Sequence, residues 1–185
     1  MPSGMTGQLA GKGKPAQMGG MRALSHRSIA VMCALFAAAA IGVALGLERW
    51  GGLAPCALCL LERWPYRAVI VLGLVAAVLP PRLARVLLWF AVLALLADVA
   101  LGVVHVGVEA GLWPSPLPEC AAPTFSGGSI AERLARMPAH PAKPCDAPSY
   151  LIPGVPISLA AGNLIFAVVF AGGLAAALLS ERRGR

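Results

Sequence analysis

The chain has 185 residues, of which 58% are hydrophobic and only 12% are charged, and its formal net charge is +7. Soluble domains carry roughly 25% charged residues, so this composition excludes an ordinary soluble protein. It predicts an all-α membrane protein with several spans. The basic residues gather in short segments between the apolar runs, which indicates membrane topology and not a nucleic-acid partner.

The first part of the chain predicts a tail followed by a span. Residues 1–27 carry four basic residues, no acidic one and no apolar periodicity, so we expect a disordered tail. Residues 28–47 contain no charge and reach about 30 Å as a helix, enough to cross a bilayer. A cleavable signal peptide is the alternative, but this apolar run is too long for one. Cys33 within it is expected to be a packed apolar side chain.

The next stretch places Cys56 and Cys59 two residues apart, followed by Glu62 and Arg63. Such a cysteine pair can close a disulfide, cycle between dithiol and disulfide, or supply two thiolates to a metal. A metal site needs two further ligands, and the remaining cysteines and histidines form no second closely spaced pair. We therefore expect no metal and favour redox chemistry.

The second span is predicted at residues 60–79, with two arginines one helical turn apart at its outer end. For Arg63, four residues beyond Cys59, contact with lipid head groups competes with a polarising role near the thiols. Arg67 is expected to reach the head groups. Trp64 and Tyr66 are expected to join an interfacial aromatic belt.

A short turn is predicted over residues 80–85 and a third span over residues 86–108. Asp98, Gly102, His105 and Glu109 recur on one face of this helix, and that face should look into the bundle. An acid near mid-membrane is usually paired and often functional, so structural pairing and proton handling both stay open for Asp98. His105 and Glu109 lie near the outer surface, where they are either structural or meet a proton or a quinone oxygen.

Residues 109–156 contain ten of the sixteen prolines and no span, so they form an exposed loop. Ser129 and Glu132 form a capping box that starts a short amphipathic helix, which we expect on the membrane surface. Its apolar face would carry Ile130, Leu134 and Met137. Cys120 and Cys145 form either a permanent staple or an exchangeable disulfide, and composition does not choose between them.

The fourth span is predicted at residues 157–179, where Asn163 is the most polar member. The tail, the turn at residues 80–85 and the end at residues 181–185 hold nine of the fifteen basic residues and one acidic residue. By the positive-inside rule both termini are cytoplasmic, and the loops at residues 48–59 and 109–156 face outward. The expected architecture is a four-helix transmembrane bundle over residues 28–180, with four cysteines in the compartment where disulfides persist.

Several motifs together resemble the DsbB family of quinone-dependent disulfide oxidoreductases. They are the Cys56-x-x-Cys59-x-x-Glu62-Arg63 sequence, the Trp-Pro-Ser-Pro segment at residues 113–116 before Cys120, and Cys145 followed by an aspartate. The resemblance covers about residues 28–179. It implies a bacterial inner-membrane enzyme with periplasmic cysteines that reoxidises DsbA, a periplasmic thioredoxin-fold oxidase. The electrons would pass to a membrane quinone, with ubiquinone favoured over menaquinone.

The resemblance also implies roles for individual residues. Cys120 and Cys145 would take electrons from DsbA, with Cys120 as its partner thiol. Cys56 would then exchange with this second pair, and Cys59 would lie beside the quinone ring. The quinone site would be completed by residues that match or resemble the family pattern, with Glu109 in place of an amide: Glu62, Arg63, His105 and Glu109.

Two alternatives remain from the residues. A relative of the vitamin K epoxide reductases would also have a helical bundle, a Cys-x-x-Cys pair and a quinone, but its active pair usually lies towards the end of the bundle. A non-enzymatic membrane scaffold would keep the four outer cysteines in inert staples or metal bonds. Redox cycling with a quinone would exclude the scaffold.

Overall fold

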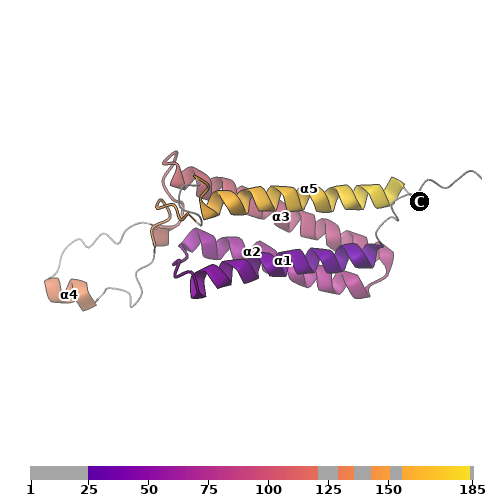
Figure 1. Ribbon diagram of the computed structural model, residues 1–185, viewed down its shortest axis with the longest axis horizontal. Coiled ribbons are helices and arrows are strands. Elements are labelled where there is room, and N and C mark those ends of the chain that lie inside the picture. Colours follow the sequence, from indigo (N-terminus) through magenta and orange to yellow (C-terminus); the bar gives the residue numbers. More distant parts are fainter. Residues whose placement is uncertain (1–24, 121–128, 136–142, 151–155, 184–185) are drawn as a thin grey trace, which may run out of the picture.

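In the computed structural model, the chain is described over residues 25–120, 129–135, 143–150 and 156–183. The first 24 residues of the predicted tail at residues 1–27 lie outside the described residues, and its last two residues belong to α1 and not to a disordered tail. Four long helices run side by side along one axis (Figure 1): α1 (His26–Arg49), α2 (Ala57–Val78), α3 (Pro81–Glu109) and α5 (Leu159–Arg183). The connection between α3 and α5 contains the 3-10 helix η1 (Pro118–Cys120) and the short helix α4 (Ile130–Ala135).

Three of these helices, α1, α3 and α5, are long and apolar enough to cross a membrane. Their mean hydropathy over the most apolar stretch is 2.4, 2.5 and 2.1. The 22-residue helix α2 is not among them, because its N-terminal half carries three charged residues, Glu62, Arg63 and Arg67. A mostly helical membrane architecture is therefore confirmed, whereas the crossing of the membrane by α2 remains a prediction.

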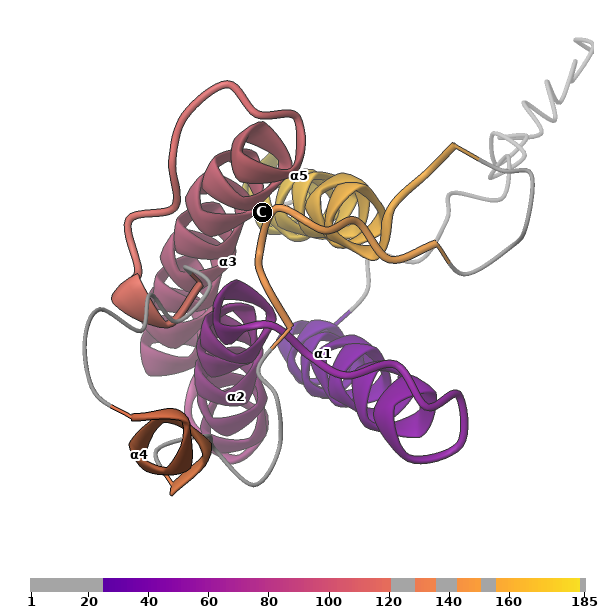
Figure 2. The same cartoon turned by 90° about the vertical axis from the view of Figure 1, so that its left-hand side faces the viewer.

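The helices pack in the order α5, α3, α2, α1, with α1 and α5 at the two ends of the series. Figure 2, a view along the bundle, shows α1 and α5 on the same side of the α2–α3 pair, and these two helices contact each other only sparsely. The α1–α2 contact is close because Gly73 faces the backbone of α1. A Cβ atom at Gly73 would lie 2.9 Å from the carbonyl oxygen of Ala30. Small residues allow such backbone approach between membrane helices.

One end of the bundle is closed by the link between α2 and α3. The prediction of a turn over residues 80–85 was wrong, because Pro80 caps α3 and the helix begins at Pro81. Proline is favoured at the first helical position, where its fixed φ angle suits the helix and its missing N–H has no partner to lose. Arg85 in the first turns of α3 pairs with Glu181 near the end of α5, at 3.4 Å. The last turns of α5 therefore lie at this end.

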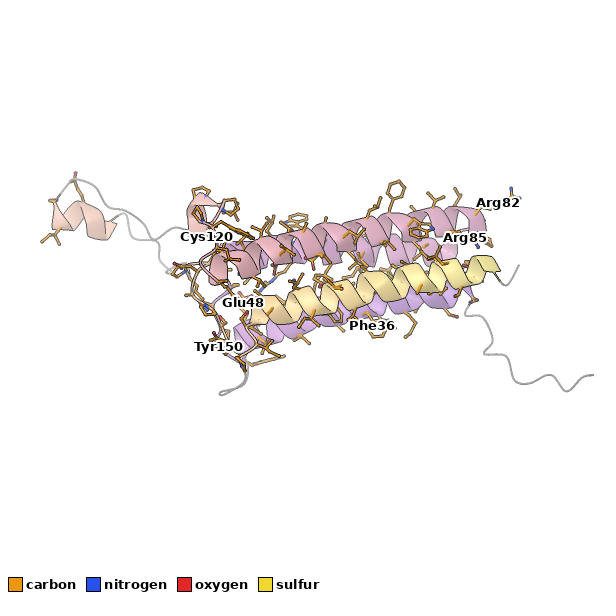
Figure 3. All side chains as sticks on the ribbon, turned by 90° about the horizontal axis from the view of Figure 1, so that it is seen from above. Phe36, Glu48, Arg82, Arg85, Cys120 and Tyr150 are labelled. Atoms are coloured by element: carbon orange, nitrogen blue, oxygen red, sulfur yellow. A yellow bond between two sulfur atoms is a disulfide. The ribbon has the colours of Figure 1, made fainter. Side chains whose placement is uncertain are left out.

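The opposite end carries the cysteines, as Figure 3 shows by placing Glu48, Cys120 and Tyr150 there, away from Arg82 and Arg85. Helix α3 stops where Gly111 adopts a φ of +68° and the Leu112 N–H donates to the Gly107 carbonyl at 2.9 Å. This is a Schellman motif, in which glycine takes the left-handed position at low cost. Trp113 then folds back on α3, and its Nε1 donates to the Val104 carbonyl at 3.1 Å.

Helix α4 begins with the predicted capping box. The Ser129 N–H donates to Glu132 Oε2 at 3.1 Å, and the Glu132 N–H donates to Ser129 Oγ at 3.4 Å. The helix lies apart from the bundle, beyond its cysteine end (Figure 1), and Ile130 is exposed. The side chains of Leu134 and Met137 lie outside the described residues. The capping box is thus confirmed, and contact of α4 with a membrane surface stays a prediction.

Candidate functional site

The Cys-x-x-Cys pair lies at the start of α2, where the helix positions both sulfur atoms. Cys56 is the N-cap residue, and its Sγ accepts a hydrogen bond from the backbone N–H of Cys59 at 3.2 Å. The two sulfur atoms are 3.0 Å apart as free thiols in hydrogen-bond contact. Cys56 is buried and Cys59 is partly exposed. The pair is therefore held at a separation from which a disulfide can close with little movement.

The position of Cys56 makes its thiolate accessible near neutral pH. A hydrogen bond from the Cys59 thiol lowers the pKa of Cys56 from 9.0 to about 7, and the Cys59 backbone N–H contributes in the same direction. Burial and the negative charge of Glu62 oppose this shift. An N-terminal helix position also favours a thiolate, because the free N–H groups carry partial positive charge. Since the thiolate is the nucleophile in disulfide exchange, Cys56 is chemically prepared for it.

The second cysteine pair forms a disulfide between Cys120 and Cys145. Both residues are buried in one cluster with Cys56, Leu58 and Val108, the last of these from the end of α3. A backbone bridge joins Cys56 to Lys143, two residues before Cys145. The two pairs predicted from the sequence are thus packed together at one end of the bundle.

His105 lies beside the first pair on the inward face of α3. Its Nε2 is 3.4 Å from Cys56 Sγ, and its Nδ1 is 2.9 Å from Glu62 Oε1. Both side chains are buried. With Nδ1 bonded to a carboxylate, Nε2 can accept a proton from the thiol and later return it. The ring is therefore placed to move protons at Cys56.

A polar chain continues inward from Glu62. Asn163 of α5 donates from Nδ2 to Glu62 Oε2 at 3.2 Å and to Asp98 Oδ2 at 3.4 Å, while its Oδ1 accepts from the Tyr66 hydroxyl at 2.8 Å. Asp98 is fully buried, as expected for the inward face of α3. Tyr66 is 3% exposed, so its predicted place in an aromatic belt was wrong, because its hydroxyl finds a partner inside the bundle. Trp64, by contrast, is 64% exposed.

The two arginines of α2 point to different surroundings. Arg63 is buried and its Nη2 donates to Glu48 Oε2 of α1 at 2.9 Å. Arg67 is exposed and stacks over the Trp64 ring at 5.1 Å. The two arginines, one helical turn apart at the start of α2, therefore differ in burial. Residues four apart differ by about 40° around a helix, which suffices here for one of them to leave the buried side.

Glu109, one turn beyond His105, contacts a different partner. It accepts a hydrogen bond from the Ser158 hydroxyl, and Ser158 Oγ in turn accepts from the Ala161 N–H at the start of α5, at 3.1 Å. Glu109 thereby fixes the beginning of α5 against the end of α3. It still lines the cavity described next.

A cavity of about 390 Å³ lies beside the first cysteine pair, between α1 and α5. Such a volume is typical of small-molecule sites, which combine apolar walls with a few placed polar groups. The apolar wall comes mainly from α1, including Phe36 (labelled in Figure 3), and from Phe166 of α5. The chemically active residues on the wall are Cys56, Cys59, Glu62, Arg63, His105, Glu109, Lys143 and Asn163.

This donor set fits a quinone. A quinone has a flat apolar ring with two carbonyl oxygens and an isoprenoid tail, so it needs apolar walls, hydrogen-bond donors and access from the bilayer. The cavity offers the Arg63 guanidinium and the Asn163 amide as donors, Cys59 as a thiol, and apolar walls on α1 and α5, which contact each other only sparsely. All four residues that were predicted to hold a quinone, Glu62, Arg63, His105 and Glu109, line it.

The structure also brings a third potential metal ligand to the pair. The ligand atoms of Cys56, Cys59 and His105 lie within 4.8 Å of one another. A structural zinc site uses four ligands, and the other ring nitrogen of His105 is bonded to Glu62. The expectation that the site binds no metal remains a prediction.

Sequence reasoning did not assign Glu48, Tyr66 and Asn163 to the site. Asn163 gave a signal, as the most polar residue of an apolar run. Glu48 directly follows the first apolar run, at residues 28–47, and pairs with the buried Arg63. An acidic residue at the end of a span is only a weak signal of a functional site. Tyr66 gave no signal in the sequence that distinguishes a position inside the bundle from one in an interfacial aromatic belt.

The family model described as "Disulfide bond formation protein DsbB" matches residues 26–177, which is most of the chain. No curated protein matches, and no solved structure matches.

Proposed function

This chain belongs to the DsbB family, and on that premise we propose that it reoxidises a periplasmic DsbA-type thiol oxidase and passes the electrons to a membrane quinone. Family membership makes the chain a disulfide bond formation protein of the membrane. One observation carries the finer proposal. Both cysteine pairs share one buried cluster, and the Cys56–Cys59 pair also lines a cavity whose walls suit a quinone.

The first steps are two disulfide exchanges. A thiolate of the reduced partner attacks the Cys120–Cys145 disulfide at Cys120, and the partner's second thiol resolves the mixed disulfide. The partner leaves oxidised, and Cys120 and Cys145 become thiols. These thiols then reduce a Cys56–Cys59 disulfide through Cys56 and reform their own disulfide. Free thiols at Cys56 and Cys59 beside a closed Cys120–Cys145 disulfide are the arrangement expected after this second exchange.

Closing the Cys56–Cys59 disulfide releases two electrons and two protons. A quinone, when bound, accepts two electrons and two protons and becomes a quinol. The protein residues supply the setting for this step. His105 Nε2 takes the proton from Cys56, 3.4 Å away, and Arg63 offers a charged donor to developing negative charge. The apolar wall from α1 lowers the polarity around these groups, which strengthens both interactions.

The same proposal includes the topology. All four long helices would cross the inner membrane, with both termini cytoplasmic and the cysteines periplasmic. Support comes from the position of Arg82 and Arg85 at the end of the bundle opposite Cys120 (Figure 3), which agrees with the positive-inside rule. The three charged residues of α2 lie in the half of the helix that begins at the cysteines, which leaves its other half uncharged.

The test is quinone reduction by the purified protein, supplied with a reduced DsbA-type partner and followed by the ultraviolet absorbance of the quinone. Wild type is expected to turn over, whereas Cys59→Ser and Cys120→Ser stall. Cys33→Ser is the matched control, because Cys33 is buried in the α1 core, outside the cluster that holds the two pairs. Ubiquinone and menaquinone analogues are compared as acceptors, and ubiquinone is expected to react faster. A wild-type protein that reduces neither quinone would refute the proposal.

A further inference from the structure

Asp98 is a buried acid that the electron relay does not use. It lies on α3, two turns further into the bundle than His105, and none of its surface is exposed. Its Oδ2 accepts from Asn163, its Oδ1 has no further hydrogen-bond partner of good geometry among the described residues, and the Tyr66 hydroxyl also interacts with the carboxyl group. An acid in the interior of a membrane bundle is strongly disfavoured unless it is protonated or paired, so its presence calls for a physical account.

Asn163 joins Asp98 to the redox site in a fixed orientation. Because the Tyr66 hydroxyl donates to Oδ1 at 2.8 Å, the amide must present its NH₂ group to the other side. There its two hydrogens meet Glu62 Oε2 at 3.2 Å and Asp98 Oδ2 at 3.4 Å. The Asn163 amide, which comes from α5, thus bridges the carboxyl group of Glu62 on α2 and that of Asp98 on α3.

The charges around this bridge do not balance if both acids are ionised. His105 is the only basic side chain that pairs with Glu62 within the described part of the chain, and no ion pair of Asp98 occurs there. Arg63, next to Glu62 in the chain, pairs with Glu48 instead. Two buried carboxyl groups that share one neutral amide cannot both keep a charge without a large desolvation cost. One proton therefore belongs to the pair.

We propose that Glu62 and Asp98, bridged by Asn163, form a proton store that serves the Cys56–Cys59 pair through His105. This inference rests on the proposed thiol:quinone function. Disulfide closure releases two protons from the sulfur atoms while the two electrons go to the quinone. His105 takes the Cys56 proton at Nε2 and passes its Nδ1 proton to the ionised Glu62, so the ring is neutral again, while the Cys59 proton leaves through the cavity that Cys59 itself lines. Glu62, His105 and Asn163 line the cavity, where the quinone takes up two protons.

Asp98 acts in this store as a positioning residue, since it reaches the cavity only through Asn163 and Glu62. By holding a proton deep in the bundle, it leaves Glu62 as the member that exchanges protons with His105, 2.9 Å away. Replacing Asp98 by asparagine keeps the shape of the side chain but removes its ability to hold this proton. In that variant Glu62 would remain as the only carboxyl group of the pair, and the proton that Asp98 holds in the wild type would be absent.

The first arm of the test needs no quinone. Infrared spectra of the reduced protein are recorded in H₂O and D₂O, and wild type is compared with Asp98→Asn. Wild type is expected to show the C=O stretch of a buried protonated carboxyl group, and Asp98→Asn is expected to lack it. Wild type without this band, or Asp98→Asn with the band unchanged, would overturn the proton store.

The second arm separates the store from a merely structural role. Asp98→Asn is expected to lower kcat for quinone reduction by at least about tenfold, with KM for the quinone changed by less than about twofold. Asp98→Glu should restore most of the rate. Tyr66→Phe, which frees the Asn163 amide, should lower kcat in the same direction, and Tyr150→Phe is its matched control because Tyr150 is exposed.

The outcomes distinguish the two proposals. If wild type reduces no quinone, the proposed function fails, while the infrared comparison still decides whether Asp98 holds a proton. Should wild type turn over while Asp98→Asn and Tyr66→Phe both keep the wild-type kcat, the relay stands and the proton store is refuted. If Asp98→Asn does not fold, Tyr66→Phe carries the kinetic arm, with an unchanged kcat again refuting the store.

Discussion

Replacing Cys59 with alanine removes the thiol that lies 3.0 Å from the Cys56 sulfur. That thiol is the largest cause that lowers the pKa of Cys56 from 9.0 to about 7. At pH 7 a thiol with a pKa of about 7 is half ionised, whereas one with a pKa of 9.0 is about 1% ionised. The Cys59 backbone N–H remains as a donor, so the expected loss of Cys56 reactivity at pH 7 is at least about tenfold.

The assay is the rate of alkylation of Cys56 by iodoacetamide as a function of pH, read by mass spectrometry of the cysteine peptide. All proteins carry alanine at Cys33, Cys120 and Cys145, so that no other disulfide or thiol takes part. The pKa of Cys56 is lowered, so its thiolate is present above pH 7 and is lost as the pH falls through about 7. In Cys59→Ala the midpoint should move upward.

Cys59→Ser is the matched control for this experiment, because the hydroxyl group can still donate to the Cys56 thiolate. Its pH profile should lie closer to that of the parent than to that of Cys59→Ala. Equal midpoints in the parent and Cys59→Ala would refute the reasoning. So would a parent midpoint near 9, since the hydrogen bond would then have no effect on the thiol.

Two further changes test other contacts. Arg63→Ala should raise the apparent KM for the quinone at least about tenfold while the fold stays intact, and Arg67→Ala, its exposed neighbour, should leave it unchanged; equal KM values in both variants would contradict this role. Gly73→Val should destabilise the bundle by about 1–3 kcal/mol, because its Cβ would meet the Ala30 carbonyl oxygen at 2.9 Å. Gly172→Val is the control, because a Cβ atom at Gly172 would have no heavy atom within 4 Å, and this variant should unfold like wild type in detergent. An equal loss of stability in Gly73→Val and Gly172→Val would count against the close contact of Gly73 with Ala30.

The helices and the inward face of α3 were predictable because both depend on local patterns. An uncharged run of about 20 residues indicates a membrane helix, and residues at offsets of three, four and seven fall on one side of it. Asp98 and His105 could therefore be placed inside the bundle from the sequence alone. The capping box at Ser129 and Glu132 is local in the same way.

The polar chain behind the thiols was not predictable, because it depends on how distant segments pack. Asn163 reaches Glu62 from 101 residues further along the chain, and Tyr66 reaches Asn163 from 97 residues away. A tyrosine near the end of a span suits an outer belt as well as an inner partner, so only the packing of α5 decides its direction. The Arg63–Glu48 pair likewise depends on the contact of α1 with α2.

The proposed function requires the Cys56–Cys59 pair to give its electrons directly to a membrane quinone. The most direct measurement uses Cys120→Ser/Cys145→Ser protein, reduced and freed of reductant, mixed anaerobically with one equivalent of a ubiquinone analogue. Mass spectrometry of the cysteine peptide and the absorbance of the quinone are followed together. The two thiols are expected to close into a disulfide as one quinone per chain becomes quinol. Persistence of both free thiols beside unreacted quinone would contradict it.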